Sequence, residues 1–258
     1  MMDLLLTNQL AIVTGASRGI GRAIAETLSA EGMKLVLVAR SQVELEALAA
    51  SLPNESFVQA ADLRNPESAN QVVAETVRHF GGIDLLVNNA GATKRGDFLT
   101  LTDNEWKDGF DLKFFGAMRL SRAAWPYLQA IQGKIVNIIG VGGRTGSAEF
   151  TIGGTVNAAL MNLTKALADR GVRDGVRVNA VNPGSIATER LQTRIQNYAR
   201  DKNITPEEAA QLLPREMRIT RFGAPVEIAR AVAFLASSQA SYIQGALLDV
   251  DGGATRAL

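Results

Sequence analysis

The residues best suited to chemistry near the start of the chain are the glycines of TGASRGIG, residues 14–21. This stretch follows an apolar run and precedes a helix-like segment. Gly15, Gly19 and Gly21 stand where a chain must turn sharply and let a pyrophosphate approach the backbone N–H groups of a helix N-terminus. Their spacing differs from G-x-G-x-x-G, and a plain tight turn is the alternative. The order of strand, glycines and helix favours a dinucleotide site.

The end of the second apolar run indicates which dinucleotide is preferred. An Asp or Glu at this place would bind the adenine ribose hydroxyls and repel a 2′-phosphate, as expected for NAD. Here the run ends in VLVARS, so the uncharged Ala39 is followed by Arg40, whose planar guanidinium can hold a phosphate. Arg18 in the glycine turn is a second cation. We therefore expect NADP(H) rather than NAD(H), although an ordinary solvated arginine is the alternative for Arg40.

The elements that must position these residues alternate between short apolar runs and longer helix-like segments. The apolar runs cover residues 10–14, 34–39, 56–60, 83–88, 134–139, 176–181 and 245–250. The helix-like segments cover residues 20–30, 42–51, 66–80, 103–128, 155–170 and 225–236. This alternation is typical of βαβ units. It predicts one α/β domain over residues 1–258: a single-domain Rossmann fold with a doubly wound, mostly parallel seven-stranded sheet and helices on both faces.

Residues 188–221 interrupt this alternation with a long, polar, helical insertion. A segment of this kind beside the carboxyl edge of a sheet is typical of a substrate lid. A solvated surface excursion is the alternative.

Charge and composition exclude several classes of protein. The 258 residues include 27 basic and 26 acidic side chains, and a net charge of +1 gives no field to attract nucleic acid or an anionic membrane. Cysteine is absent, which excludes disulfides, thiolate chemistry and cysteine metal sites. No apolar run approaches the roughly 20 residues needed to span a bilayer. We expect a cytoplasmic protein with a small-molecule substrate and no metal.

Five motifs in a fixed order resemble those of the short-chain dehydrogenase/reductase family, and within it the β-ketoacyl carrier-protein reductases. They are TGASRGIG at 14–21, DL at 62–63, NNAG at 88–91, NPGSIAT at 182–188 and VDGG at 250–253. The resemblance implies that the second motif lies at the adenine, the third along the middle of the cofactor and the fourth at the nicotinamide. The cofactor-binding residues that it implies are Gly15, Ser17, Arg18, Gly19, Ile20, Gly21, Arg40, Asp62, Leu63, Asn88, Asn89, Ala90, Gly91, Pro183, Gly184, Ile186 and Thr188. It also implies a homotetramer or a homodimer.

The same resemblance locates the positions of the family's catalytic residues. The family reduces carbonyls with a tyrosine that donates a proton and a lysine that lowers the tyrosine's pKa. A serine holds the substrate oxygen, and an asparagine supports the lysine. In this chain the tyrosine, lysine, serine and asparagine positions fall on Gly153, Asn157, Gly140 and Lys113, so all four residues are replaced. Other candidates are remote or are polar loop residues: Tyr127, Tyr198, Tyr242, Lys165, His79, Ser147, Glu149 and Thr151.

The replacements at Lys113 and Asn157 follow a pattern. The family's asparagine has become a lysine and its lysine an asparagine, so an amine and a carboxamide have exchanged places across one cavity. A desolvated Lys113 would be a tunable acid near the vacated tyrosine position. Drift in a site no longer used for this chemistry is the alternative.

Two functions are compatible with these features. The first is an NADP-dependent oxidoreductase with a non-standard active site, in which Lys113 is the catalytic acid and the substrate is a small carbonyl or hydroxy compound. The second is a catalytically inactive NADP(H)-binding protein that acts as a sensor or scaffold. Loss of a general acid typically costs ~10²–10⁴-fold in rate. We therefore expect weak activity on standard β-ketoacyl substrates.

Overall fold

A seven-stranded parallel sheet forms the centre of the computed structural model, which describes residues 3–256. The strand order is β3-β2-β1-β4-β5-β6-β7, and each neighbouring pair is parallel. The strands are β1 (Leu10–Thr14), β2 (Lys34–Ala39), β3 (Ser56–Ala60), β4 (Leu85–Asn88), β5 (Lys134–Ile138), β6 (Arg177–Pro183) and β7 (Leu247–Val250). The predicted doubly wound Rossmann fold is confirmed. The order reverses between β1 and β4, the place where such folds bind ligands.

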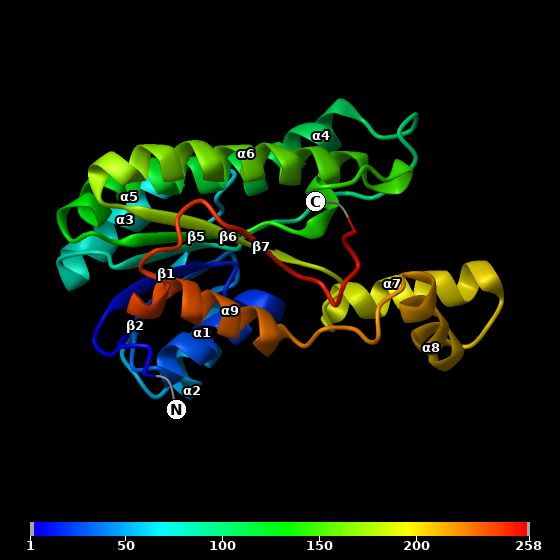
Figure 1. Cartoon of the computed structure of the whole chain (residues 1–258), viewed down its shortest axis with the longest axis horizontal. Helices are drawn as coiled ribbons and strands as arrows, with labels where there is room; N and C mark the ends of the chain where they lie inside the picture. The colour runs from blue at the N-terminus through cyan, green and yellow to red at the C-terminus, as the bar shows by residue number, and fades with distance from the viewer. Residues whose placement is uncertain (1–2, 257–258) are drawn as a thin grey trace.

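Helices cover both faces of this sheet (Figure 1). They are α1 (Gly19–Ala30), α2 (Gln42–Ser51), α3 (Ser68–Phe80), α4 (Asp103–Gly109), α5 (Gly116–Ala130), α6 (Thr151–Asp174), α7 (Glu189–Lys202), α8 (Pro206–Glu216) and α9 (Pro225–Ala236). Successive side chains of a strand point to opposite faces. Ala11 and Val13 of β1 therefore pack with α1, α2 and α9, whereas Leu10 and Ile12 pack with α3, α5 and α6.

The middle helix differs from its prediction. The continuous helix expected over residues 103–128 is divided into α4, a π-helical segment at Phe110–Phe115 and α5. Its start at Thr102 was predicted, and a capping box holds it, because the Thr102 hydroxyl and the Glu105 carboxylate each accept a backbone N–H. Single π turns often occur at functional sites, and this one carries Lys113.

Helix α6 is longer than predicted at both ends. It begins at Thr151 and ends at Asp174, where residues 155–170 were expected. Gly171, which follows the predicted end, lies inside the helix, and a Cβ at this position would overlap the carbonyl oxygen of Val176. Gly171 therefore allows close packing of Val176 on the helix. The residue that caps the helix is instead Gly175, which has a φ of +73°.

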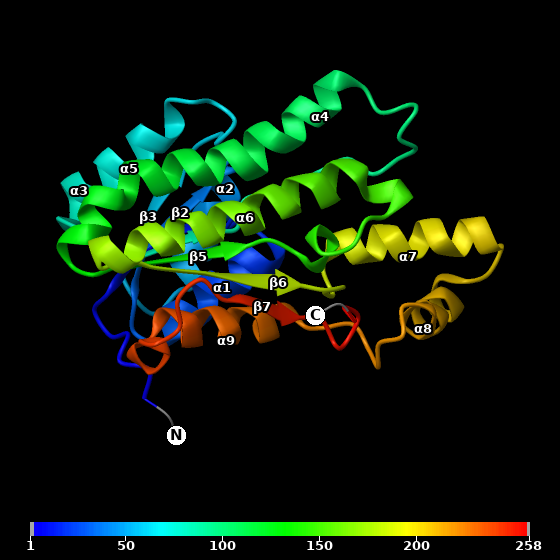
Figure 2. The same ribbon diagram turned by 45° about the horizontal axis from the view of Figure 1, so that its top comes forward.

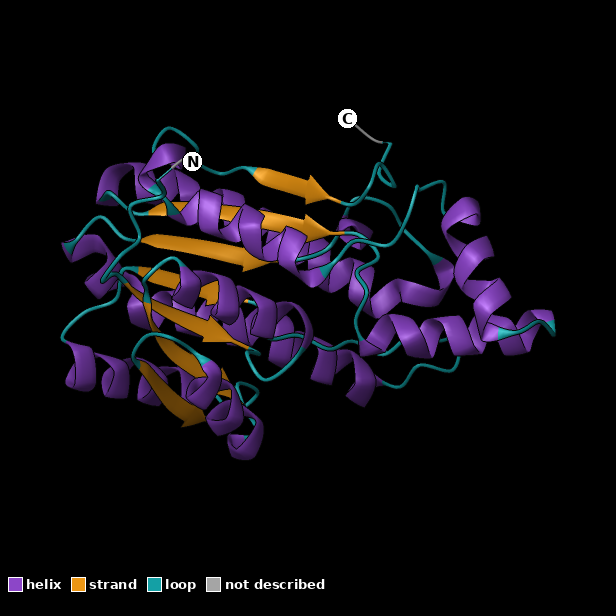
Figure 3. Ribbon diagram, turned by 90° about the horizontal axis from the view of Figure 1, so that it is seen from below, coloured by secondary structure: helices purple, strands orange, loops and turns teal. Residues whose placement is uncertain are grey.

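The segment after β6 extends beyond the carboxyl edge of the sheet. Figure 2 shows α7 and α8 side by side past this edge, and Figure 3 shows that the strands point toward them. The predicted helical insertion at 188–221 is therefore present as two helices. Within residues 3–256, no helix combines the length and apolar character needed to cross a membrane.

Candidate active site

The glycine turn lies against the loop that follows β4. The Thr14 hydroxyl donates to the carbonyl oxygen of Val87 over 3.1 Å and accepts the N–H groups of Asn89 and Ala90 at 2.9 and 3.0 Å. The Asn89 amide donates in turn to the carbonyl oxygens of Thr14 and Gly15 at 2.9 and 3.2 Å. These contacts bring two predicted cofactor segments together at the point where the strand order reverses.

The geometry of this turn fits a pyrophosphate. Gly15 and Gly19 have φ angles of +64° and +57°, which L side chains rarely adopt. A Cβ at Gly15 would also lie 2.9 Å from the Asn89 amide nitrogen. The N-terminus of α1 has no side-chain cap from Arg18 and no acidic residue in its first turn. Its free N–H groups and positive dipole end are therefore available to an anion.

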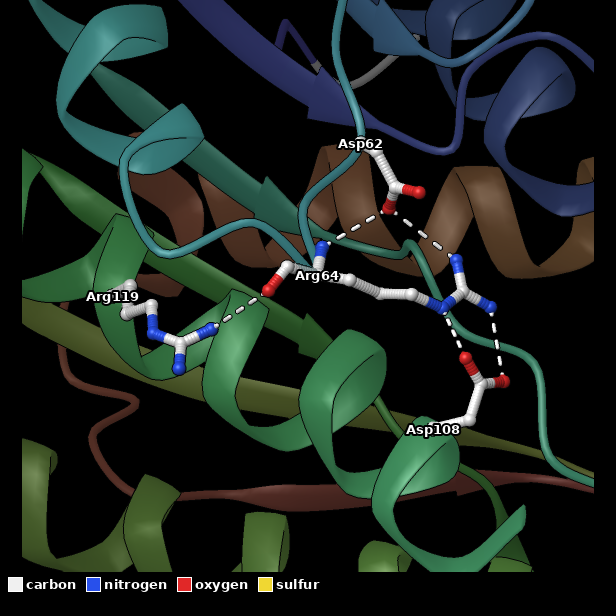
Figure 4. Close-up of polar contacts among 4 residues, drawn as sticks. All are labelled: Asp62, Arg64, Asp108 and Arg119. Carbon is white, nitrogen blue, oxygen red and sulfur yellow. Dashed lines mark hydrogen bonds and ion pairs between the residues drawn. The ribbon is translucent and has the colours of Figure 1, made fainter. Parts of the chain in front are cut away.

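At the predicted adenine end, Arg64 joins Asp62 to α4 (Figure 4). The Arg64 guanidinium donates to Asp62 over 3.3 Å and makes a two-point contact with Asp108, with 3.1 Å between Nη2 and Oδ2. The backbone N–H of Arg64 also donates to Asp62 over 3.0 Å, and Arg119 donates to the Arg64 carbonyl over 3.3 Å. Arg64 therefore fixes the turn after β3 against the middle helix. Neither Arg64 nor Asp108 was predicted from the sequence.

The two predicted phosphate-binding arginines have different surroundings. Hydrogen bonds from Arg64 lower the pKa of Asp108, and the charge of the exposed Arg40, which follows β2, lowers it further. Arg18 instead forms an exposed ion pair with Glu189, at the start of α7, over 3.3 Å. Arg40 is therefore positioned by the end of β2, whereas Arg18 connects the glycine turn to the insertion.

At the predicted nicotinamide end, Lys113 and Asn157 are in direct contact. The Lys113 ammonium donates to the carboxamide oxygen of Asn157 over 2.6 Å and to the carbonyl oxygen of Ile139 over 2.5 Å. The Asn157 amide donates to the carbonyl oxygen of Gly140 over 3.3 Å. The π-helical segment, α6 and the end of β5 thus meet at one ammonium group.

Burial lowers the pKa of Lys113 from its ordinary value of 10.5 to about 7, and the charge of Arg190 adds to this shift. The aliphatic part of Lys113 packs on Gly91, where an added Cβ would lie 2.9 Å from the lysine Cδ. Arg190 donates to the Gly91 carbonyl over 2.5 Å. The ammonium therefore loses hydration and lies near a second cation, and both effects favour its neutral form.

The positions assigned to the serine and the tyrosine have little free space. Gly140 has a φ of +127°, so an L residue would be strained there. A Cβ at Gly153 would overlap the ring of Phe150, and one at Gly142 would lie 2.9 Å from the same ring. Phe150, which the sequence analysis missed, therefore fills the volume next to residue 153. No local pattern in the sequence indicates this contact.

Two further arginines that the sequence analysis missed contact Phe150 and the loop after β6, which is predicted to bind the nicotinamide. The guanidinium of Arg95 stacks over the Phe150 ring, 4.1 Å from its centroid. Arg194 of α7 donates to the Ser185 hydroxyl over 3.4 Å. Partial burial lowers the pKa of Arg95 and the charge of Arg194 lowers it further, whereas the charge of Glu149 opposes this shift.

The remaining predicted cofactor residues lie on the loops at the same edge. Thr188 packs against Gly19, with 3.4 Å between its methyl carbon and a Cβ built on that glycine. The Gly184 N–H donates to Val250 over 3.1 Å, and Ile186 bridges to Gly223. Ser17 is half-buried in the glycine turn. Leu63 and Ile20 also pack into the two cores.

The residues set aside in the sequence analysis lie apart from the Lys113 contact. His79 stacks on Phe57, with 4.6 Å between ring centroids, and Lys165 is exposed on α6. Ser147 and Glu149 are exposed loop residues. The buried hydroxyl of Thr151 has no hydrogen-bond partner among the described residues.

Comparison with known proteins gives matches along almost the whole chain. A family model described as enoyl-(acyl carrier protein) reductase matches residues 15–255. The 3-oxoacyl-(acyl-carrier-protein) reductase FabG of Vibrio cholerae is 36% identical over 249 residues, which cover 96% of this chain and 98% of that protein. The FabG of Escherichia coli K12 is 35% identical over 249 residues, 95% of this chain and 96% of that protein.

Solved structures resemble the fold over the same extent. The structure of L-sorbose reductase from Gluconobacter frateurii, complexed with NADPH and L-sorbose, has a TM-score of 0.94 and 33% identity and covers 100% of both chains. A variant of actinorhodin polyketide ketoreductase, solved with NADPH, has a TM-score of 0.92 and 30% identity and covers 97% of this chain and 98% of that chain.

Proposed function

Because this chain belongs to the short-chain dehydrogenase/reductase family, and because the relatives named above are oxidoreductases, we propose that it is an NADP(H)-dependent oxidoreductase with a non-standard active site. Its substrate is a small carbonyl compound, or the corresponding alcohol in the reverse direction. Lys113 takes the proton-donor role of the family's tyrosine.

Two observations support NADP(H) as the cofactor. The uncharged Ala39 at the end of β2 is followed by the exposed Arg40, which can meet a 2′-phosphate. The similar L-sorbose reductase and polyketide ketoreductase were both solved with NADPH. The turn at Gly15 and Gly19, with the uncapped N-terminus of α1, fits the pyrophosphate.

When bound, the cofactor supplies a hydride and its electron pair to the carbonyl carbon, so NADPH becomes NADP⁺, the π pair moves to oxygen, and that oxygen takes one proton. Lys113 is suited to deliver this proton. An ammonium group has three N–H donors, and contacts with Ile139 and Asn157 use two of them. The third is left for a substrate oxygen. With a pKa of about 7, this acid is matched to neutral pH.

The ammonium held between Ile139 and Asn157 is the observation that carries this proposal. The two contacts orient the nitrogen from two different elements, so its third donor direction is restricted. Asn157 is itself held by the carbonyl of Gly140. Asn157 is therefore a positioning residue, and Lys113 is the catalytic residue.

One observation favours a second candidate function, NADP(H) binding without turnover. The Phe150 ring lies where a side chain on residue 153 would begin, so the position assigned to the catalytic tyrosine is filled by an apolar group. A sensor or scaffold would keep the cofactor cleft and need no proton donor.

We also propose that α7 and α8 form a lid over the substrate, because Arg190 and Arg194 of α7 reach the nicotinamide end. The oligomer implied by the resemblance, a homotetramer or homodimer, and the cytoplasmic location remain predictions.

Lys113→Met tests the proposed role, because methionine has a similar length but no charge. NADPH oxidation should be followed with a panel of small aldehydes and ketones, and NADPH affinity should be measured by calorimetry. We expect turnover to fall by ~10²–10⁴-fold, with little change in NADPH affinity. Lys165→Met, at an exposed lysine of α6, is the matched control and should behave as the wild type.

The other outcomes separate the two functions. Turnover that survives in Lys113→Met contradicts the role of this lysine. A wild-type protein that binds NADPH but reduces no carbonyl in the panel supports the binding function.

A further inference from the structure

Arg144 joins the turn after β5, residues 140–144, to β7 at the edge of the sheet. Its Nε atom lies 2.8 Å from a carboxylate oxygen of Asp249, and its Nη2 atom donates to the carbonyl oxygen of Leu247 over 3.0 Å. The side chains of Arg144 and Asp249 are each only 24% exposed. The Asp249 carboxylate also accepts the amide of the fully buried Asn182 over 2.7 Å. The position of this ion pair is therefore fixed by both β6 and β7.

The turn itself has few side chains that could hold it in place. Three of residues 140–143 are glycines, and glycine loses more backbone freedom than any other residue when a chain is ordered. Close packing on α6 requires glycine here, because a Cβ built on Gly142 would lie 2.9 Å from the Phe150 ring and one on Gly143 would lie 2.8 Å from the backbone of α6. Arg144 therefore supplies the polar side-chain contacts that the glycines cannot make.

The turn begins at Gly140, whose carbonyl oxygen accepts two hydrogen bonds. One comes from the backbone N–H of Gly143 and one from the Asn157 amide, each over 3.3 Å. The direction of this carbonyl thus depends on the turn. Ile139 differs, because its backbone N–H donates to β6 over 3.0 Å and the sheet fixes it. Of the two acceptors that contact the Lys113 ammonium, Asn157 is therefore the one that depends on the turn.

We propose that Arg144 is a positioning residue for the proton donor. By tying the turn to Asp249, Arg144 fixes the direction of the Gly140 carbonyl. That carbonyl holds the Asn157 amide, and the carboxamide oxygen of Asn157 accepts the Lys113 ammonium at 2.6 Å. This inference rests on the proposed function, in which Lys113 delivers the proton.

The effect of Arg144 on Lys113 is expected to be geometric. Burial is the larger cause of the lowered pKa of Lys113, and the charge of Arg190 on α7 is the second cause. Arg144 is paired with Asp249, so it acts on the ammonium through packing rather than through its own charge. A looser turn would let water reach the ammonium, and hydration favours the charged form.

The titration of Lys113 measures this effect without turnover. NMR of the protein with isotope-labelled lysine follows the pKa of each amine, and Lys113→Met identifies the signal of Lys113. Arg144→Met should raise the pKa of Lys113 from about 7 toward 10.5, by about one pH unit or more. Asp249→Asn removes the charge from the other side of the pair with little change in shape, and it should shift the pKa in the same direction.

Arg170→Met is the matched control. Arg170 pairs with Asp174 over 2.6 Å on α6, the helix that carries Asn157, and its side chain is 56% exposed. Its loss removes an ion pair from the same helix but no contact of the turn after β5, so the pKa of Lys113 should stay at its wild-type value. Thermal melting of each variant checks its folding.

A double-mutant cycle with Asn157 separates positioning from a general loss of stability. In the wild-type background Arg144→Met should lower kcat for carbonyl reduction about tenfold, with little change in the KM for NADPH. Asn157→Ala removes the link through which Arg144 acts. In that background Arg144→Met should change kcat by less than about twofold and leave the pKa of Lys113 nearly unchanged. A merely structural role would instead give equal effects in both backgrounds.

Two results overturn the proposal: a pKa of Lys113 that is the same in the wild type, Arg144→Met and Asp249→Asn, or effects that are additive with Asn157→Ala. The outcome can be separated from that of the proposed function. A shifted Lys113 pKa in a protein that reduces no carbonyl would retain the positioning role and refute the catalytic function. Turnover that is lost in Lys113→Met but unchanged in Arg144→Met would do the reverse.

Discussion

Lys113→Met should change how the free energy of unfolding depends on pH. In the folded protein, burial and then the charge of Arg190 lower the pKa of Lys113 to about 7. In the unfolded chain the same group titrates near its ordinary pKa of 10.5. Between these two values the unfolded state binds a proton that the folded state has released. Stability must therefore rise with pH across this window.

The size of the effect follows from the two pKa values. Each unit of pKa difference corresponds to about 1.4 kcal/mol. With partial titration at both ends included, Lys113 should add about 2.5 kcal/mol to the free energy of unfolding between about pH 7.5 and 9.5. Methionine does not titrate, so Lys113→Met lacks this pH-dependent contribution to the free energy of unfolding. It also leaves the Ile139 carbonyl and the Asn157 carboxamide oxygen without the lysine donor, but this cost is the same at every pH.

Urea unfolding of the wild type and Lys113→Met, at fixed protein concentration and ionic strength, measures the difference directly. Subtracting the two curves removes every other group that titrates in the same range. Lys165→Met should follow the wild type, because Lys165 is exposed. A difference between the wild type and Lys113→Met that stays constant to within about 0.5 kcal/mol across the window would show that Lys113 is not dehydrated, and the reasoning would be refuted.

Two further predictions concern the cofactor and the filled position. Arg40→Asp should reverse the order of affinity so that NADH binds more tightly than NADPH, because a carboxylate repels the 2′-phosphate. Equal affinities of the wild type for both cofactors, measured by calorimetry, would contradict the role of Arg40. Gly153→Ala should destabilise the protein by about 1–2 kcal/mol, because its Cβ overlaps the Phe150 ring. In a Phe150→Ala background, Gly153→Ala should instead stabilise the protein by up to about 1 kcal/mol, because alanine has the higher helix propensity. If the two substitutions change the free energy of urea unfolding additively, the explanation is refuted.

The sequence predicted those features that depend on local pattern. Runs such as residues 34–39 and 134–139 are mostly apolar, as is typical of strands buried on both faces, and they form β2 (Lys34–Ala39) and β5 (Lys134–Ile138). Gly15 and Gly19 were recognised because they stand in the turn between a strand and a helix, and both have the positive φ angles that favour glycine. The family resemblance predicted that Lys113 and Asn157 lie across one cavity, and in the structure the two side chains are in direct contact.

Features that depend on contacts between distant segments were not predicted. The contact of Phe150 with Gly153 is local by comparison, because Phe150 is the N-cap of α6, but it depends on the direction of one side chain, which no periodicity records. Arg144 and Asp249 are 105 residues apart in the sequence, and Arg64 meets Asp108 only because the turn after β3 lies against α4. The early start of α6 likewise shows tertiary packing overriding the poor helix propensity of two consecutive glycines.

The pH dependence of carbonyl reduction at saturating NADPH tests the proton-donor role of Lys113 most directly. If the ammonium donates the proton, kcat/KM of the wild type should fall as pH rises through about 7, and the reverse oxidation should rise over the same range. Lys113→Met should show only its low residual rate, without this step. A wild-type rate of reduction that stays constant between about pH 6 and 9 would contradict the account.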